Sequence, residues 1–211
     1  MVLPSDCPPW EYESHPLRPE LAATTAELLK GLRRSGATRA AAKDTRPVHW
    51  RLFRRLTPPG VAYYAGHYRG EEYRCLKTYE VTIPADARVG TPAARVLGSV
   101  SQLSAAIERL LAALDSGTAV PKAQLPEADR LLCVVAVASR VFVELLTIHP
   151  YANGNGHAAR FCVWTILGRY GYWPNRWPID PRPPDPPYSE LIVRYRNGER
   201  EPLERFIMGS I

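Results

Sequence analysis

The sequence lacks most of the features that mark membrane, secreted and disulfide-rich proteins. Its 211 residues include only four cysteines, none in a C-x-x-C pair, so a disulfide scaffold or a zinc knuckle is not expected. The longest uninterrupted apolar run, residues 131–138, is too short to cross a bilayer. The stretch MVLPSDCPPWEYESHP lacks the basic head and apolar core of a secretory signal. We therefore expect a cytoplasmic protein with no membrane partner, or an effector exported by a non-classical route.

Acidic residues are fewer than basic ones, and the imbalance gives a formal net charge of +6. A basic chain suits polyanionic ligands such as nucleotide phosphates or nucleic acid. The basic residues are nevertheless spread along the chain, without a clustered basic helix or an aromatic platform for bases. Nucleic acid is therefore not an expected partner.

Hydrophobic periodicity predicts a mainly α-helical fold. Apolar residues at helical spacing favour helices over residues 17–35, 47–56, 96–117, 156–170, 188–196 and 202–208. Residues 131–146 are apolar nearly all round, which is typical of a helix at the centre of a domain. Cys133 and Cys162 lie in such apolar patterns and are expected in the core.

Two segments break the helical pattern. Residues 61–83 are rich in tyrosine and β-branched residues and predict a β-hairpin, the only β signal in the chain. The stretch WPNRWPIDPRPPDPPY, residues 173–188, contains too many prolines for regular structure. We expect a solvent-facing wrap or a polyproline II segment, and we favour a packed connection over a ligand for a proline-binding module.

The stretch HPYANGNGHAAR, residues 149–160, carries the strongest chemical signal. Pro150 disfavours helix at His149, so the preceding helix should end there. Gly154 and Gly156 allow a tight turn that leads into the next helix, whose free amides and dipole favour an anion. Arg160 follows one turn later and can reach the same anion. His149, with an ordinary pKa of about 6.5, suits a general base.

Weaker interpretations of this stretch exist. An Asn-Gly pair often forms a hairpin turn, but the flanks here have helical rather than alternating patterns. A single histidine after an apolar helix can be structural. A zinc site built from His149, His157 and Cys162 would lack a familiar ligand spacing. The joint occurrence of histidine, glycine-rich turn and arginine favours the anion site.

The stretch resembles the signature of Fic (Fido-fold) proteins, H-x-F-x-[D/E]-G-N-G-R-x-x-R. His149, Gly154, Asn155, Gly156 and Arg160 match it, and Tyr151 replaces phenylalanine. The resemblance implies a Fic helical core with one β-hairpin flap. It also implies two parts, an N-terminal helical extension at 1–58 and a Fic domain at 59–211.

The resemblance further implies an enzyme, a nucleotidyltransferase of the protein adenylyltransferase kind. Such enzymes move AMP from ATP to a serine, threonine or tyrosine hydroxyl of a protein, and relatives transfer UMP, phosphocholine or phosphate. His149 would be the general base, while Gly154, Asn155 and Gly156 would form the anion hole. Arg160 would bind the distal phosphates, and the hairpin would align the target segment.

Two residues depart from the signature. Asn153 replaces the acid that binds Mg²⁺, and an amide offers only an uncharged oxygen. His157 replaces a phosphate-binding arginine. Both residues keep their places among the expected nucleotide-binding residues, Asn153 also as a weak Mg²⁺ ligand. The alternative is a weakened or inactive Fic-fold binding or regulatory module. The family's inhibitory motif [S/T]-x-x-x-E-[G/N] is missing, which leaves a separate inhibitor protein acting in trans as one expectation.

Overall fold

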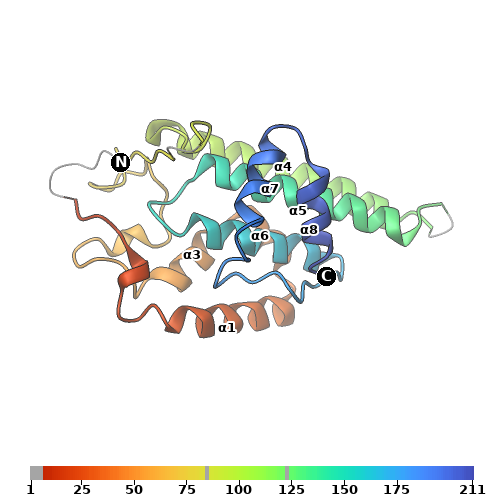
Figure 1. Cartoon of the computed structure of the whole chain (residues 1–211), viewed down its shortest axis with the longest axis horizontal. Helices are drawn as coiled ribbons and strands as arrows, with labels where there is room; N and C mark the ends of the chain where they lie inside the picture. Colours follow the sequence, from red (N-terminus) through yellow and green to blue (C-terminus); the bar gives the residue numbers. More distant parts are fainter. Residues whose placement is uncertain (1–6, 84–85, 122–123) are drawn as a thin grey trace.

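The computed structural model describes residues 7–83, 86–121 and 124–211, and every regular element in these ranges is helical (Figure 1). The mainly α prediction is therefore confirmed. The elements, in chain order, are η1 Tyr12–Ser14, α1 Glu20–Ser35, α2 Thr38–Lys43, α3 Arg46–Phe53, η2 Ala62–Tyr64, α4 Ala93–Thr118, α5 Glu127–Ile148, α6 Asn155–Arg169, α7 Tyr188–Arg196 and α8 Glu201–Met208.

Helices α5 and α6 form the centre of the fold. Helix α6 is buried on every side, because all residues from His157 to Gly168 are shielded from solvent. Helix α5 packs on α6, α4 and α8. Its length and composition would allow it to cross a membrane, but it runs through this core, and half of its most apolar window is buried.

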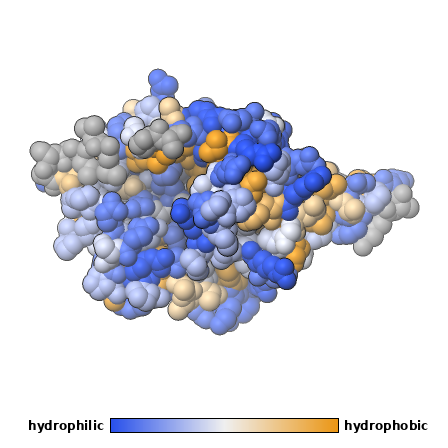
Figure 2. Space-filling model, in the orientation of Figure 1, coloured by the Kyte–Doolittle hydropathy of each residue, from blue (hydrophilic) through white to orange (hydrophobic). Residues whose placement is uncertain are grey.

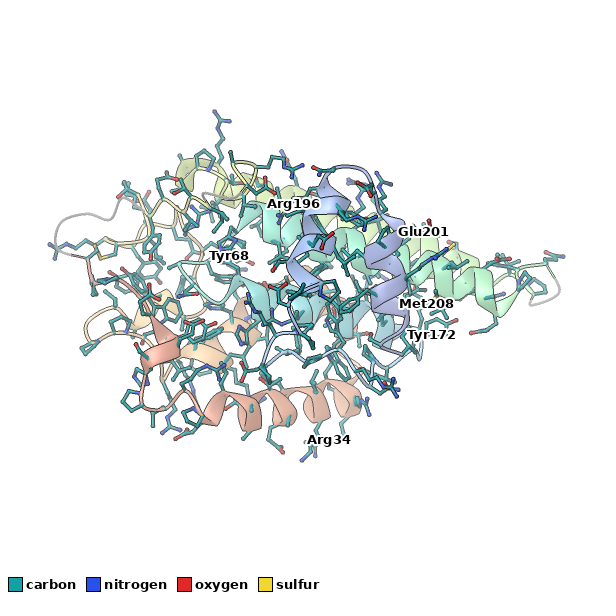
Figure 3. All side chains as sticks on the ribbon, in the orientation of Figure 1. Arg34, Tyr68, Tyr172, Arg196, Glu201 and Met208 are labelled. Atoms are coloured by element: carbon teal, nitrogen blue, oxygen red, sulfur yellow. A yellow bond between two sulfur atoms is a disulfide. The ribbon has the colours of Figure 1, made fainter. Side chains whose placement is uncertain are left out.

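Helix α5 also contributes to an exposed apolar surface. Leu132 is half exposed, and Cys133 is exposed as well, so the prediction of a core position for Cys133 was wrong. Figure 2 shows apolar residues where α5 meets α8, on a face that is otherwise largely hydrophilic. Charged side chains such as Arg34 and Glu201 point outward from the body (Figure 3). The dispersed charge expected from the sequence is therefore largely a solvated surface.

Glycine and proline residues set several helix ends. Gly36 adopts φ 62° and closes α1 through its amide to the carbonyl of Leu32. Pro126 precedes the first residue of α5. Helix α5 ends at Ile148, as Pro150 predicted. The short helix α2 was not predicted, because its six residues are too few to display a period.

The predicted β-hairpin at 61–83 does not form. These described residues contain η2, turns and irregular backbone in place of two strands. Arg69 ties this segment to the core. Its buried guanidinium donates to the carbonyls of Tyr79, Thr91, Ile148 and His149 at 2.8–3.2 Å. The carbonyl of Tyr79, within the segment, is thus satisfied by a side chain and not by a strand ladder.

The proline-rich segment is a packed connection, as predicted. Trp177 and Ile179 are buried in it. The indole of Trp164 donates to the carbonyl of Trp177 at 2.8 Å, and the indole of Trp177 donates to the carbonyl of Arg160 at 3.2 Å. The segment is therefore fixed along α6, and it carries Asp180 toward the start of that helix.

A disulfide joins Cys7 to Cys75, with Cα atoms 5.7 Å apart. The sequence spacing gave no sign of this bridge, although a single bridge is not the disulfide scaffold that the cysteine spacing argued against. The bridge ties the N-terminal segment to the irregular 61–83 region. Cys162 is buried, as expected.

Residues before 59 belong to the same hydrophobic core as the rest of the described chain. Helices α1, α2 and α3 all pack on α6. Trp10 is buried, and its indole donates to the carbonyl of Leu56 at 2.8 Å. A boundary between an extension and a Fic domain near residue 58 stays a prediction.

Candidate functional site

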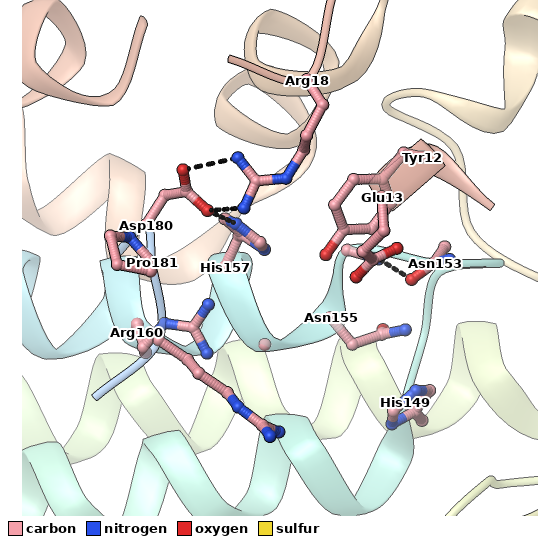
Figure 4. A pocket seen from close by; sticks show the side chains of 13 residues that line it. Tyr12, Glu13, Arg18, His149, Asn153, Asn155, His157, Arg160, Asp180 and Pro181 are labelled. Atoms are coloured by element: carbon pink, nitrogen blue, oxygen red, sulfur yellow. Dashed lines mark hydrogen bonds and ion pairs between the residues drawn. The ribbon is translucent and has the colours of Figure 1, made fainter. Parts of the chain in front are cut away.

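One pocket of about 530 Å³ collects every residue that the motif predicted for the site (Figure 4). Its predicted lining residues are His149, Asn153, Gly154, Asn155, Gly156, His157 and Arg160. Sequence reasoning missed the others, which are Tyr12, Glu13, Arg18, Asp180, Pro181 and Arg182. The missed residues come from the N-terminal segment and the proline-rich connection, far from the motif in sequence.

The loop between α5 and α6 is closed by its own side chains. The side-chain amide of Asn155 donates to the carbonyl of Tyr151 at 2.9 Å, and its oxygen accepts from the amide of Tyr151 at 2.8 Å. Gly154 adopts φ 76° directly before α6. Within the part of the chain that the structure describes, the main-chain N–H groups of Asn155 and Gly156 have no acceptor. They form the start of a helix, where an anion is stabilised.

Helix α3 packs against this loop and holds it through His49. His49 is completely buried and bonds the carbonyl of Asn153 through Nε2 at 2.9 Å, while its Nδ1 accepts from the amide of Gly66 at 2.9 Å. Its ring stacks on Tyr151 with 3.7 Å between centroids. The Tyr151 hydroxyl bonds Thr45 at 2.7 Å. The loop is therefore held by polar contacts that no local sequence pattern reveals.

His149 has the geometry of a neutral base. It adopts φ 54°, and its amide caps α5 through the carbonyl of Leu145. Its Nδ1 lies 3.3 Å from the carbonyl of Leu146, which requires Nδ1 to carry the proton and leaves Nε2 as an acceptor. Burial lowers the pKa of His149 to about 4, and the nearby Arg69 contributes to the lowering. The imidazole is therefore neutral near pH 7.

Arg69 also fixes the backbone that presents His149. Its Nε donates to the carbonyl of His149 at 2.8 Å, and its amide donates to the carbonyl of Pro150 at 2.8 Å. A cation at the C-terminus of a helix stabilises the helix dipole. Burial lowers the pKa of Arg69 to about 10, so the guanidinium keeps its charge near neutral pH.

Asn153 does not fit the role of a metal ligand. Its side-chain amide donates to the carbonyl of Trp10 at 2.7 Å, and its oxygen accepts from the amide of Gly154 at 2.8 Å. An aspartate here could not donate to Trp10, so the asparagine suits its structural position. Among the described residues, no group of three or more histidine, cysteine or acidic side chains could hold a metal ion.

His157 is bound to a carboxylate. Its Nε2 lies 3.1 Å from Oδ1 of Asp180, and the same carboxylate accepts two hydrogen bonds from Arg18, at 2.8 and 2.7 Å. Burial lowers the pKa of His157. The neutral Nε2–H therefore donates to Asp180. His157 orients this carboxylate, and it supplies no permanent positive charge to the pocket.

Arg160 lies against the loop, as its spacing predicted. Its Nη1 would be 2.9 Å from a Cβ added to Gly156, so a side chain there would require the guanidinium to shift. Its Nε donates to the carbonyl of Ile179 at 2.9 Å. With both histidines neutral, three arginines and two carboxylates leave the pocket lining net positive. The pocket is therefore suited to a small anion.

No protein-family model and no curated protein matches the sequence. The resemblance to Fic proteins therefore rests on the motif at residues 149–160 alone.

The buried histidines predict a loss of stability in mild acid. The pKa of His149 is lowered to about 4 and that of His49 to about 3, both mainly by burial. Below pH 6.5 the unfolded chain binds protons that the folded chain excludes, so the free energy of unfolding falls as pH falls toward 4. Each histidine contributes up to about 1.4 kcal/mol per pH unit. Urea denaturation between pH 7 and pH 4.5 measures this slope, and His149→Asn should flatten it. A slope unchanged by that variant would show that His149 titrates normally.

Proposed function

We propose that the protein is a transferase that moves AMP, or a related phosphate-containing group, from a nucleotide donor to a protein hydroxyl. One observation carries the proposal. His149, whose Nε2 is left as an acceptor, lines the same pocket as Asn155 and Gly156, whose main-chain N–H groups have no acceptor among the described residues. This pairing would place a proton acceptor and an anion site around one phosphate.

The proposed step needs few groups. The target hydroxyl oxygen forms a bond to the donor phosphorus nearest His149, and its proton passes to Nε2. The bond from that phosphorus to the leaving group breaks, which releases pyrophosphate when the donor is ATP. The amides of Asn155 and Gly156, with Arg160, would stabilise the phosphate charge. Catalysis of this type rests on positioning and electrostatics.

Donor and cofactor remain part of the proposal. We favour ATP, with Mg²⁺ accompanying its phosphates, because Mg²⁺ commonly binds substrate phosphates and few protein ligands. Asn153 is a poor ligand for Mg²⁺, because its side chain is already hydrogen-bonded to the main chain of Trp10 and Gly154. No step above depends on the metal.

The proposed partner is a protein with a serine, threonine or tyrosine hydroxyl. Alignment by a β-hairpin has no support, because residues 61–83 lack strands. A separate inhibitor protein remains an expectation, and a nucleic-acid partner stays disfavoured. For location, the Cys7–Cys75 bridge favours the exported alternative over the cytoplasm, since disulfides are rare in reducing compartments.

A non-catalytic nucleotide-binding module is the second candidate. Two hydrogen bonds favour this module. His157 is bonded to Asp180 and Asn153 to Trp10, so neither side chain is free for a ligand. The two candidates share the anion pocket and differ in turnover.

Labelling and calorimetry test the proposal together. We expect labelled ATP to modify a protein in cell lysate, with UTP, GTP and CDP-choline as the other donors. Wild type should bind ATP, and Arg160→Ala should weaken binding about tenfold or more, because one charged hydrogen bond is lost. Arg55→Ala, which breaks an exposed ion pair with Glu20 outside the pocket, is the matched control and should leave ATP binding unchanged. Binding without labelling by any donor would favour the module, and no binding at millimolar ATP would refute both candidates.

A further inference from the structure

The N-terminal segment contributes an arginine to the pocket that the motif does not contain. Figure 4 shows Arg18, Asp180 and His157 together at one end of the pocket and His149 at the other. The anion loop lies between them. A polyphosphate whose reacting phosphorus lies beside His149 would therefore extend toward Arg18.

Asp180 holds the Arg18 guanidinium in one orientation. Its side chain is only 3% exposed and accepts from both terminal nitrogens of Arg18. His157 supplies a third hydrogen bond to the same carboxylate. A guanidinium has five N–H groups, so three remain for another acceptor. The Arg18 side chain is 28% exposed and lines the pocket, which leaves part of this group accessible.

The other arginines of the pocket are less suited to that end. Arg160 is buried, and its Nε and Nη1 contact Ile179 and the Tyr188 hydroxyl. Arg182 is largely exposed and lies 3.6 Å from Asp185. Arg18 alone among the three combines a fixed fork with partial exposure to the pocket.

The backbone before Arg18 is anchored at several points. Cys7 is bonded to Cys75, and Trp10 is buried while its carbonyl accepts from Asn153. Tyr12 is buried with its ring 5.7 Å from that of His157. The segment is thus part of the pocket wall, so Arg18 needs little ordering before it meets a ligand.

We propose that Arg18 is a phosphate-binding residue, supplied by the N-terminal segment and oriented by Asp180 and His157, for the phosphates farthest from His149. This inference rests on the proposed function, because it assumes a nucleotide in the pocket. It names the ligand class as a nucleoside di- or triphosphate. A planar, permanently charged fork suits phosphate oxygens.

Calorimetry with ATP and AMP, without added Mg²⁺, tests the role of Arg18. The deciding variant is the double substitution Arg18→Gln and Asp180→Asn, which removes both charges and leaves no buried unpaired carboxylate. We expect it to weaken ATP binding roughly ten- to a hundredfold. AMP binding should change less than about threefold, because AMP lacks the distal phosphates.

Two further variants distinguish phosphate binding by Arg18 from a purely structural role of the Arg18–Asp180 ion pair. Arg18→Lys keeps the charge but loses the fork, so its ATP affinity should lie between those of wild type and the double variant. Arg55→Gln breaks an exposed ion pair with Glu20 outside the pocket and should leave ATP affinity unchanged. Melting curves establish that each variant is folded.

The outcomes distinguish the two proposals. If wild type binds ATP and the double variant binds it equally well, the Arg18–Asp180 ion pair has only a structural role. The inference is then overturned, while the proposed function stands. Equal weakening of ATP and AMP also overturns the assignment to distal phosphates. If wild type binds neither nucleotide at millimolar concentration, the proposed function fails and the role of Arg18 fails with it.

Discussion

His149→Asn should lower the rate of group transfer by about 10²–10⁴-fold, the usual contribution of a general base. Asparagine is the most informative replacement at this position. It tolerates the left-handed backbone that His149 adopts at φ 54°. Its side-chain amide can replace Nδ1 as donor to the carbonyl of Leu146. The variant therefore removes the acceptor Nε2 and keeps the cap of α5. Initial rates of protein labelling measure the effect.

His149→Gly and nucleotide binding are the controls for this experiment. Glycine relieves the cost of positive φ, so this variant should stay folded while also lacking the base. ATP affinity should change little in both variants, because the neutral His149 supplies no charge to the phosphates and the main-chain N–H groups of Asn155 and Gly156 are kept. Labelling at the wild-type rate in a folded variant would contradict the role of His149.

Gly154→Ala should destabilise the fold by about 2–5 kcal/mol and abolish anion binding. An added Cβ would lie 2.7 Å from Cζ of the fully buried Phe53 and 2.9 Å from Nε2 of His49. Overpacking costs about 1–3 kcal/mol, and left-handed backbone with a side chain costs about 1–2 kcal/mol more. Urea denaturation at pH 7 measures the free energy of unfolding.

Gly60→Ala isolates the backbone component of that loss. Gly60 has φ 81° and no atom within 4 Å of an added Cβ. It should therefore show only the cost of the left-handed backbone, about 1–2 kcal/mol. Equal losses at the two positions would mean that Phe53 and His49 move aside, and that the loop is not clamped by α3.

Sequence periodicity predicted the long helices because their stability comes from one apolar stripe. Positions such as Val96, Leu103 and Ile107 recur at helical spacing in the sequence and are buried in α4. The 61–83 region misled the same reasoning. Its tyrosines favour strands on average, yet Tyr64 is buried in η2 and Tyr79 is buried in irregular backbone, where its carbonyl accepts from Arg69. Burial against a particular partner overrode the local preference.

The site could be predicted only where it is continuous in sequence. Residues 149–160 comprise the loop after α5 and the first residues of α6, so glycine, proline and histidine at fixed offsets were enough to indicate the candidate site. The contributions of His49, Arg18 and Asp180 depend on how α3, the N-terminal segment and the proline-rich connection pack together. No spacing encodes that packing, and the pairing of Cys7 with Cys75 was hidden for the same reason.

The bond from Arg18 to Asp180 joins residues 162 positions apart, which has a consequence for synthesis. A ribosome adds roughly 5–20 residues per second, so about 8–30 s separate the emergence of the two partners. During most of that interval the loop at residues 149–156 has not been synthesised, and throughout it the early arginine has no carboxylate to orient it. A chain released before the proline-rich connection has emerged would therefore carry an incomplete pocket. Competence to bind a ligand therefore follows the synthesis of Asp180.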